Sequence, residues 1–226
     1  MAIRVISSKR SGAVMRVLVS LWLVALFAVG SGCEGSEPLD RSAVFAAKAE
    51  SLGMVLHEDL PEAVAGTIRA MPGIAFRQGS SFPRVLAHDR ALIFDWVWRE
   101  DALDPPRTVE QTVFATRYKG ARLPSFLIAE IGNASDEEVE FAGGAVRFTT
   151  PNQWIQRYVI AGRSKSLLRK LFPIELRSNW KIPSMMRIEA NGEWAVAYYP
   201  GRSSNPETLE WEFGDIQAVL APWSSN

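Results

Sequence analysis

The chain has 226 residues and no formal net charge, with 47% hydrophobic and 22% charged residues, a composition that is typical of a globular protein and excludes a disordered one. Residues 1–32 hold four basic residues and no acidic one, so the rest of the chain holds 21 basic and 25 acidic residues. A weakly acidic domain argues against nucleic acid as a partner, because general binding to nucleic acid needs a strongly basic surface.

Residues 1–32 have the pattern of a signal peptide. Val17–Val29 is an apolar run of about 13 residues, with basic residues before it and the small residues 30–32 after it. A membrane-spanning helix needs about 20 apolar residues, whereas the shorter run is typical of the apolar core of a signal peptide. Met15 offers a second start with the same signal. We therefore predict that residues 1–32 are a signal peptide.

The small residues before Cys33 resemble the lipobox of bacterial lipoproteins, in which the cysteine carries the lipid and begins the mature protein. The sequence departs from the usual lipobox at Gly30, where leucine is most common. The alternatives to lipidation are ordinary signal-peptide cleavage nearby and an uncleaved anchor. It implies acylation of Cys33 by palmitate-type chains and a cell-envelope protein that is lipid-anchored to a membrane and faces the periplasm or the outside. Cys33 is the single cysteine, so no internal disulfide is expected. Residues 33–40 are polar and predict a short tether.

Two helices are predicted at the start of the domain that follows, residues 41–226. Asp40–Leu52 is rich in alanine and places its apolar residues at helical spacing, and Gly53 is a suitable end for this helix. Pro61–Ala70 has proline in its first turn and a Pro-Gly pair after it, which predicts a second, short helix.

The pattern then changes to that of strands. Leu92–Trp98 alternates with period two, and one of its two faces is wholly apolar. Thr108–Tyr118 also alternates and is rich in β-branched and aromatic residues. Leu123–Ile128 predicts a third strand, and together the three segments indicate an antiparallel meander.

The middle of the chain mixes polar and apolar segments. Gly132–Gly144 is acidic and polar, so it predicts a surface loop and the most mobile part of the domain. Trp154–Ile160 predicts a further strand. Ser164 is a suitable N-cap for a helix over Lys165–Phe172, whose leucines and phenylalanine share one side.

The C-terminal third contains the clearest local signals. Asn191-Gly192 lies between two alternating apolar runs within Met186–Tyr199, which predicts a two-residue type I′ hairpin packed on the final helix. Asn205 as a cap and Pro206 at the first turn predict that final helix. The fold class is therefore α+β, with an antiparallel sheet of about five to seven strands and helices near the N-terminus, after residue 163 and at the C-terminus.

A series of short motifs resembles a known group of proteins. The motifs are Phe94-Asp95, Gln111-Thr112, Leu123-Pro124 with Phe126, Tyr158 before Gly162, Leu171-Phe172, a glycine-centred hairpin and a final helix opened by proline. Their order over residues 74–222 is similar to that in an uncharacterised bacterial family of membrane-associated or secreted α+β proteins. The motifs are short and mostly structural, so the resemblance implies a single α+β unit and assigns no site residue.

Residues with catalytic or metal-binding chemistry are few. The two histidines, His57 and His88, each lie beside an acidic residue, but neighbouring residues on a strand point to opposite faces and do not form a ligand set alone. The chain has no Gly-x-Ser-x-Gly elbow and no glycine-rich phosphate loop. We therefore expect no cofactor, no metal site and no assignable catalytic residue.

Two features could form binding surfaces. Basic residues gather between positions 157 and 181, and the four around the predicted helix, Arg163, Lys165, Arg169 and Lys170, are candidates for contact with an anionic surface. A plain solvated helix face is the alternative. Tryptophans 96, 98, 154, 180, 194 and 211 predict core residues or an aromatic platform for a sugar or an apolar partner.

The sequence favours a lipid-anchored envelope protein that binds a partner protein or an envelope component and is not an enzyme. The alternative is a hydrolase that acts on an envelope polymer through carboxylate catalysis, which needs two carboxylates facing each other across a pocket. The expected partners are a membrane, through the lipid anchor, and a further protein.

Overall fold

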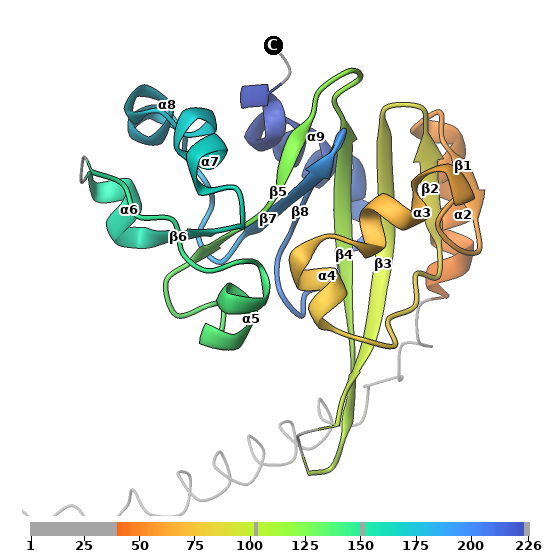
Figure 1. Ribbon diagram of the computed structural model, residues 1–226. Helices are drawn as coiled ribbons and strands as arrows, with labels where there is room; N and C mark the ends of the chain where they lie inside the picture. The colour runs from red at the N-terminus through yellow and green to blue at the C-terminus, as the bar shows by residue number, and fades with distance from the viewer. Residues whose placement is uncertain (1–39, 102–103, 150–151, 224–226) are drawn as a thin grey trace, which may run out of the picture. The chain divides into compact units, whose positions relative to one another are not determined.

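The computed structural model describes residues 40–101, 104–149 and 152–223, and it groups Arg41–Asn226 as one compact unit. Figure 1 shows strands β1 Val55–His57, β2 Val85–His88, β3 Ala91–Glu100, β4 Arg107–Arg117, β5 Leu123–Glu130, β6 Tyr158–Ala161, β7 Arg187–Gly192 and β8 Trp194–Tyr198. The α-helices are α2 Arg41–Ser51, α3 Glu62–Arg69, α4 Pro72–Phe76, α5 Asp136–Phe141, α6 Gln153–Arg157, α7 Lys165–Leu171, α8 Ile174–Asn179 and α9 Leu209–Leu220. Short 3-10 turns, Pro206–Thr208 and Ala221–Trp223, flank α9.

The strands form one antiparallel sheet of eight strands in the order β1-β2-β3-β4-β8-β7-β5-β6. This confirms the α+β class with an antiparallel sheet, and the predicted helices near the N-terminus, after residue 163 and at the C-terminus are present. The predicted number of strands was slightly low. The sequence reading missed the three-residue strand β1 and the four-residue strand β2, which are too short to show a clear alternation.

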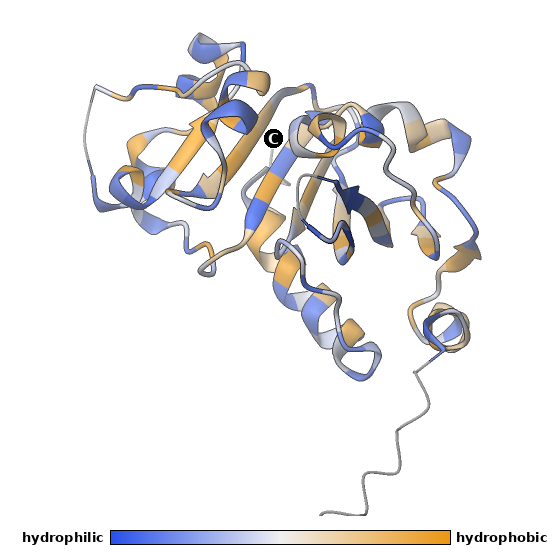
Figure 2. Ribbon diagram, turned by 90° about the horizontal axis from the view of Figure 1, so that it is seen from below, coloured by the Kyte–Doolittle hydropathy of each residue, from blue (hydrophilic) through white to orange (hydrophobic). Residues whose placement is uncertain are grey.

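The sheet is covered by helices on both faces, so the interior consists of two main apolar clusters. On β3 the apolar residues Leu92, Phe94, Trp96 and Trp98 pack with α3 and α4, whereas Ile93 faces the cluster formed with α2, α7 and α9. Figure 1 shows α3 and α4 in front of the central strands and α9 behind them, and hydrophobic colour runs along the strands in Figure 2. The described residues of these clusters lie between positions 45 and 223, within the compact unit Arg41–Asn226.

The predicted meander is correct for β3 and β4 but wrong for β5. Strands β2, β3 and β4 are consecutive antiparallel neighbours, whereas β5 pairs with β6 and β7. The hairpin β7–β8 occupies the place beside β4. Alternation identifies a strand and its apolar face, but it does not show which strand pairs with it. The pairing partners of β5 could therefore not be predicted from the pattern.

The predicted surface loop over Gly132–Gly144 is wrong, because it contains the helix α5. Ser135 caps this helix: its hydroxyl accepts from the Glu138 N–H, and the Glu138 carboxylate accepts from the Ser135 N–H, both at 3.2 Å. This reciprocal pair is a capping box, which occurs at helix starts. Glu138 is buried, so the acidic segment is attached to the core.

The predicted strand over Trp154–Ile160 is correct only in its second half. Residues 153–157 form α6, because the Asn152 side chain accepts from the Ile155 N–H at 3.2 Å and caps a helical turn. The Trp154 ring stacks on that of Trp180, with centroids 5.9 Å apart. A cap and ring stacking therefore override the β propensity of this segment.

The hairpin within Met186–Tyr199 is present, but its turn is shifted by one residue. Asn191 pairs with Trp194, so the loop is Gly192-Glu193, and Gly192 has a φ of +61° whereas Glu193 does not have a positive φ. This sign pattern belongs to a type II′ turn and not to the predicted type I′. The Asn191 amide donates to the Thr67 carbonyl of α3 at 3.4 Å, so the turn lies against α3, and it is β8 that packs on α9.

The remaining helices agree with the sequence in position. The predicted helices near residues 40–52 and 61–70 correspond to α2 and α3, and α7 follows Ser164. Ser164 makes no side-chain capping bond, so that part of the prediction is wrong. Asn205 accepts from the Glu207 N–H at 3.0 Å and opens the turn before α9, as predicted.

Candidate functional site

The predicted lipidation site, Cys33, lies outside the described residues, so the lipid anchor stays a prediction. Within residues 40–223, apart from the two short gaps, no helix combines the length and apolar character that a membrane crossing requires.

The basic residues of α7 divide into two kinds. Lys165 donates through Nζ to the Ala145 carbonyl at 2.8 Å, and Arg169 donates through Nε to the Arg147 carbonyl at 2.9 Å. Both therefore hold the segment that pairs with the β6 edge, where Ala145 forms a bridge to Ala161. Arg163 and Lys170 are exposed, so they form the more accessible part of the predicted basic surface.

Apolar side chains interrupt this basic surface. Leu167 on α7 is 53% exposed. Arg163, Leu167 and Lys170 follow one another at helical spacing of four and three residues, and we call the surface that they form the α7 face. It combines positive charge with an exposed apolar group, which is the chemistry of helices that lie at a lipid interface.

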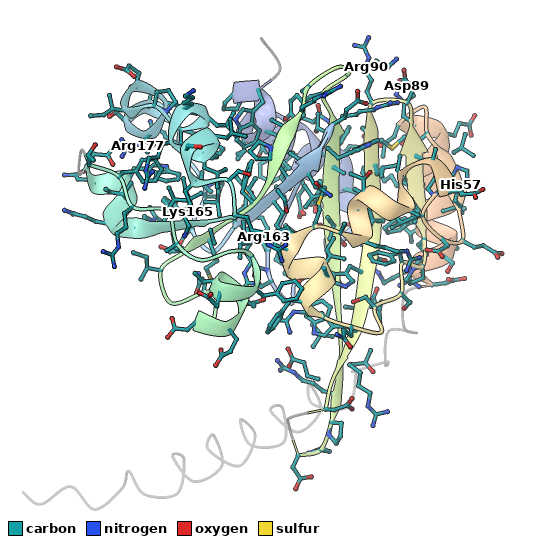
Figure 3. All side chains as sticks on the ribbon, in the orientation of Figure 1. His57, Asp89, Arg90, Arg163, Lys165 and Arg177 are labelled. Carbon is teal, nitrogen blue, oxygen red and sulfur yellow. The ribbon has the colours of Figure 1, made fainter. Side chains whose placement is uncertain are left out.

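Arg177 does not belong to this surface, although the sequence placed it in the same basic stretch. Its side chain is buried, and Nε donates to the Phe172 carbonyl at 3.1 Å. Its guanidinium lies over the Phe148 ring, 4.3 Å from the centroid. Figure 3 shows Arg177 beside α6 and α8, apart from Lys165 and Arg163. The residue therefore connects the small helices to one another.

The tryptophans are core residues with one exception. Trp96, Trp98, Trp154, Trp180 and Trp194 are all buried. Trp211 on α9 is 68% exposed. The core interpretation is therefore correct for five of them, and the proposed aromatic platform does not form from this set.

The histidines do not converge. His57 lies on the edge strand β1, and His88 is exposed at the end of β2 with Nδ1 3.0 Å from an Asp89 carboxylate oxygen. No three His, Cys, Asp or Glu side chains in the described segments come together as a metal site would require.

A buried polar cluster between the sheet and the helices α4 and α5 was missed by the sequence reading. Arg187 on β7 binds Glu138 of α5 through two hydrogen bonds, of 2.9 and 3.1 Å. Beside it, Glu189 accepts from the Tyr198 hydroxyl and, at 2.7 Å, from the Gly73 N–H of α4. Burial raises the pKa of the Glu189 carboxyl and that of the Tyr198 phenol. The carboxylates of Glu138 and Glu189 thus both have structural hydrogen-bond partners.

A second polar cluster connects α2 with the central strands. Asp95 on β3 is completely buried and accepts from Arg41 at 2.8 Å, from Arg84 at 2.8 Å and from Thr112 at 2.9 Å. Glu110 on β4 lies 3.0 Å from Arg41 and 2.7 Å from Arg84. The charges of the two arginines and the two carboxylates neutralise one another. The cluster therefore has a structural role: it joins α2 to strands β3 and β4.

A further feature of the described residues lies at one end of the sheet, where the β2–β3 turn and the β4–β5 connection meet α9 and the residues after α2. A cavity of about 660 Å³ is present there. We call it the sheet-end pocket; its wall includes Met54, Tyr118, Phe213 and Trp223, and its edge includes Arg90, Arg117 and Lys119. Arg90 lies in the β2–β3 turn, Arg117 ends β4 and Lys119 follows it, so the antiparallel pairing of β3 with β4 brings the three together.

Comparison with known proteins gives a likeness at the level of the fold. No family model and no curated protein sequence matches the chain. A crystal structure of the mycobacterial trehalose monomycolate transport factor A, TtfA, is similar, with a TM-score of 0.51, 11% identical residues, and coverage of 83% of this chain and 94% of that chain. At this identity the likeness shows that the two chains share a fold.

Proposed function

We propose that this chain is an envelope protein that is held at a membrane by a lipid on Cys33 and binds an envelope component or a partner protein without catalysis. The signal-peptide pattern and the small residues before Cys33 support export and anchoring. The fold likeness to a trehalose monomycolate transport factor is in keeping with a role in the envelope. The observation that carries the proposal is the α7 face, which joins exposed basic residues to the exposed Leu167.

The contact with the membrane is electrostatic in its first step. Each basic residue near an anionic surface contributes at most about 1 kcal/mol, and the effect falls off within a Debye length. Leu167 then adds an apolar group that can enter the headgroup layer, while the long Lys and Arg side chains extend to the phosphates. Lys165 and Arg169 hold the neighbouring backbone, so the face is fixed before it meets lipid.

The structure favours binding over the carboxylate hydrolase. That mechanism needs two carboxylates free to act on opposite sides of one bond. The buried carboxylates of Asp95, Glu138 and Glu189 instead bind arginines, a phenol or a backbone N–H. Two carboxylates, Glu212 and Asp215, line a cavity of about 420 Å³ beside α9. The Glu212 oxygens accept from Ser204 at 2.5 Å and from Thr208 at 2.9 Å, so this carboxylate is held by structural partners.

Vesicle binding by residues 40–226, without lipid, tests the α7 face. We expect sedimentation with anionic vesicles at low salt, release at high salt because exposed charges are then screened, and no binding to zwitterionic vesicles. The double variant Arg163→Glu/Lys170→Glu should bind at least about tenfold more weakly. These two side chains are exposed, and neither supplies the bonds that hold the Ala145–Arg147 backbone.

The matched control is Arg99→Glu/Arg122→Glu, which makes the same charge change at exposed positions elsewhere. It should keep most of the vesicle binding. Equal loss in both double variants, or no binding by the unmodified chain, would show that the α7 face is ordinary solvated surface.

Membrane fractionation with a radioactive fatty-acid label tests the anchor. We expect the wild-type chain to take up the label and to sediment with membranes, and the Cys33→Ser variant to be unlabelled and released, because a single residue carries the lipid. Alanine at Ser31 is the control, since a small residue before the cysteine is kept. Equal labelling of wild type and Cys33→Ser would exclude acylation at this position.

A further inference from the structure

The sheet-end pocket has two chemically different parts. Met54, Phe213 and Trp223 supply apolar surface from the α2–β1 connection, from α9 and from the turn after it. Arg90 and Lys119 stand at the edge, in the turns that connect the strands. Its volume of about 660 Å³ falls within the range of about 300–1,000 Å³ that small-molecule sites occupy.

The charged side chains that line this pocket are all basic. Lys119 lies 3.1 Å from Asp89 and Arg117 lies 2.8 Å from Glu193, and neither acidic residue lines the pocket. The guanidinium of Arg90 is exposed and has no hydrogen bond or ion pair with any residue that the structure describes. Asp89 also interacts electrostatically with its neighbour Arg90. The three basic side chains at the edge therefore meet two acidic ones, Asp89 and Glu193. The edge keeps a net positive charge, and this favours an anionic group.

Two residues with side-chain N–H groups, Gln217 and Trp223, also line the pocket. Trp223 is 3% exposed, and its indole N–H is buried without a hydrogen-bond partner among the described residues. A buried donor without an acceptor is rare in a folded protein. Gln217 on α9 also lines the pocket and is half-buried. Both side chains can donate to an oxygen atom of a ligand.

We propose that the sheet-end pocket binds an anionic amphiphile, a molecule with one acyl chain and one anionic headgroup. The acyl chain lies against Met54, Phe213 and Trp223, and the headgroup lies at the edge beside Arg90 and Lys119. The pocket uses none of the residues of the α7 face, so this proposal goes beyond contact with a membrane surface. A failure of vesicle binding would contradict the role of the α7 face alone, and a failure of ligand binding would contradict the role of the sheet-end pocket alone.

Calorimetric titration of residues 40–226 with decanoate, below the concentration at which it aggregates, tests the proposal. We expect saturable binding of one decanoate per chain. Acetate carries the charge without the chain, and decyltrimethylammonium carries the chain with the opposite charge, so both should bind at least about tenfold more weakly. Equal binding of either compound would overturn the proposal, and so would the absence of decanoate binding.

Two variants locate the ligand. Arg90→Glu reverses the exposed charge at the edge, and Gln217→Glu puts a carboxylate on the pocket wall with almost no change of shape. Each should weaken decanoate binding about tenfold or more. Arg122→Glu, an exposed arginine at the same end of the sheet that does not line the pocket, is the matched control and should bind as wild type does.

The thermal midpoint of each variant shows whether its fold is intact. Arg90 makes no side-chain hydrogen bond in the described structure, so its replacement should leave the midpoint unchanged. If Arg90→Glu is folded and binds decanoate as tightly as wild type, or if Arg122→Glu loses as much affinity, decanoate does not bind in this pocket and the proposal is wrong.

Discussion

Replacing Arg187 with methionine should lower the free energy of unfolding by about 3–5 kcal/mol. The side chains of Arg187 and Glu138 are 6% and 3% exposed, and two hydrogen bonds join them. Methionine fills much of the space of the arginine stem but leaves the buried Glu138 carboxylate without its main partner, and only the longer contact with Arg77, of 3.4 Å, remains as an ion pair. It also removes the positive charge beside the buried Glu189, whose carboxyl then depends on Tyr198 and the Gly73 N–H alone.

Urea unfolding followed by tryptophan fluorescence measures this loss. Arg107→Met is the control, because Arg107 forms an ion pair with Glu100 at 2.8 Å but its side chain is 64% exposed. An exposed pair contributes little, so the midpoint of the control should barely move. If the two variants unfold at the same urea concentration, the buried pair does not stabilise the packing of α5 on the sheet.

Asp95→Ala should cost about 3 kcal/mol, at the lower end of the range for a broken buried ion pair. Asp95 is completely buried, but its partners Arg41 and Arg84 are each 21% exposed, so water can partly solvate them when the carboxylate is gone. The Thr112 hydroxyl also loses its acceptor on Asp95. Glu110 still pairs with both arginines in the variant, and this limits the loss of stability.

Asp101→Ala provides the comparison, since Asp101 pairs with Arg99 at 2.5 Å and both side chains are largely exposed. Its thermal midpoint should stay near that of wild type. Limited proteolysis adds a local measurement: in Asp95→Ala, cleavage within α2 should become faster, because Arg41 is the first residue of that helix. A stable Asp95→Ala variant with a protected α2 would show that the cluster is dispensable.

The sequence predicted the elements whose signal is local. The alternation of Leu92–Trp98 identified β3 and its wholly apolar face, which packs with α3 and α4, and the cap at Asn205 identified the start of the last helical segment. The hairpin was found for the same reason, but the turn type depended on a shift of one residue. Positive φ at Gly192 alone is what the type II′ turn needs, so glycine fits either register.

The errors arose where distant residues decide the structure. Ser135 and Glu138 have the spacing of a capping box, and this signal was available in the sequence, but the acidic composition suggested a loop. The bond from Glu138 to Arg187 spans 49 residues and could not be read from either segment. The sheet-end pocket depends on the strand order, because Arg90 and Lys119 belong to different turns.

The bonds of Arg41 determine how a mechanical load would enter the domain. Its guanidinium joins the start of α2 to Asp95 on β3 and to the Ser204 carbonyl before α9. Tension applied through residue 40 is therefore shared at once by a central strand and by the C-terminal part of the chain. The three-residue edge strand β1 follows α2, so the bonds of Arg41 carry the tension before it reaches the pairing of β1 with β2. A pull from the N-terminal side would therefore load β3, which has a neighbouring strand on each side, before it loads the edge strand β1.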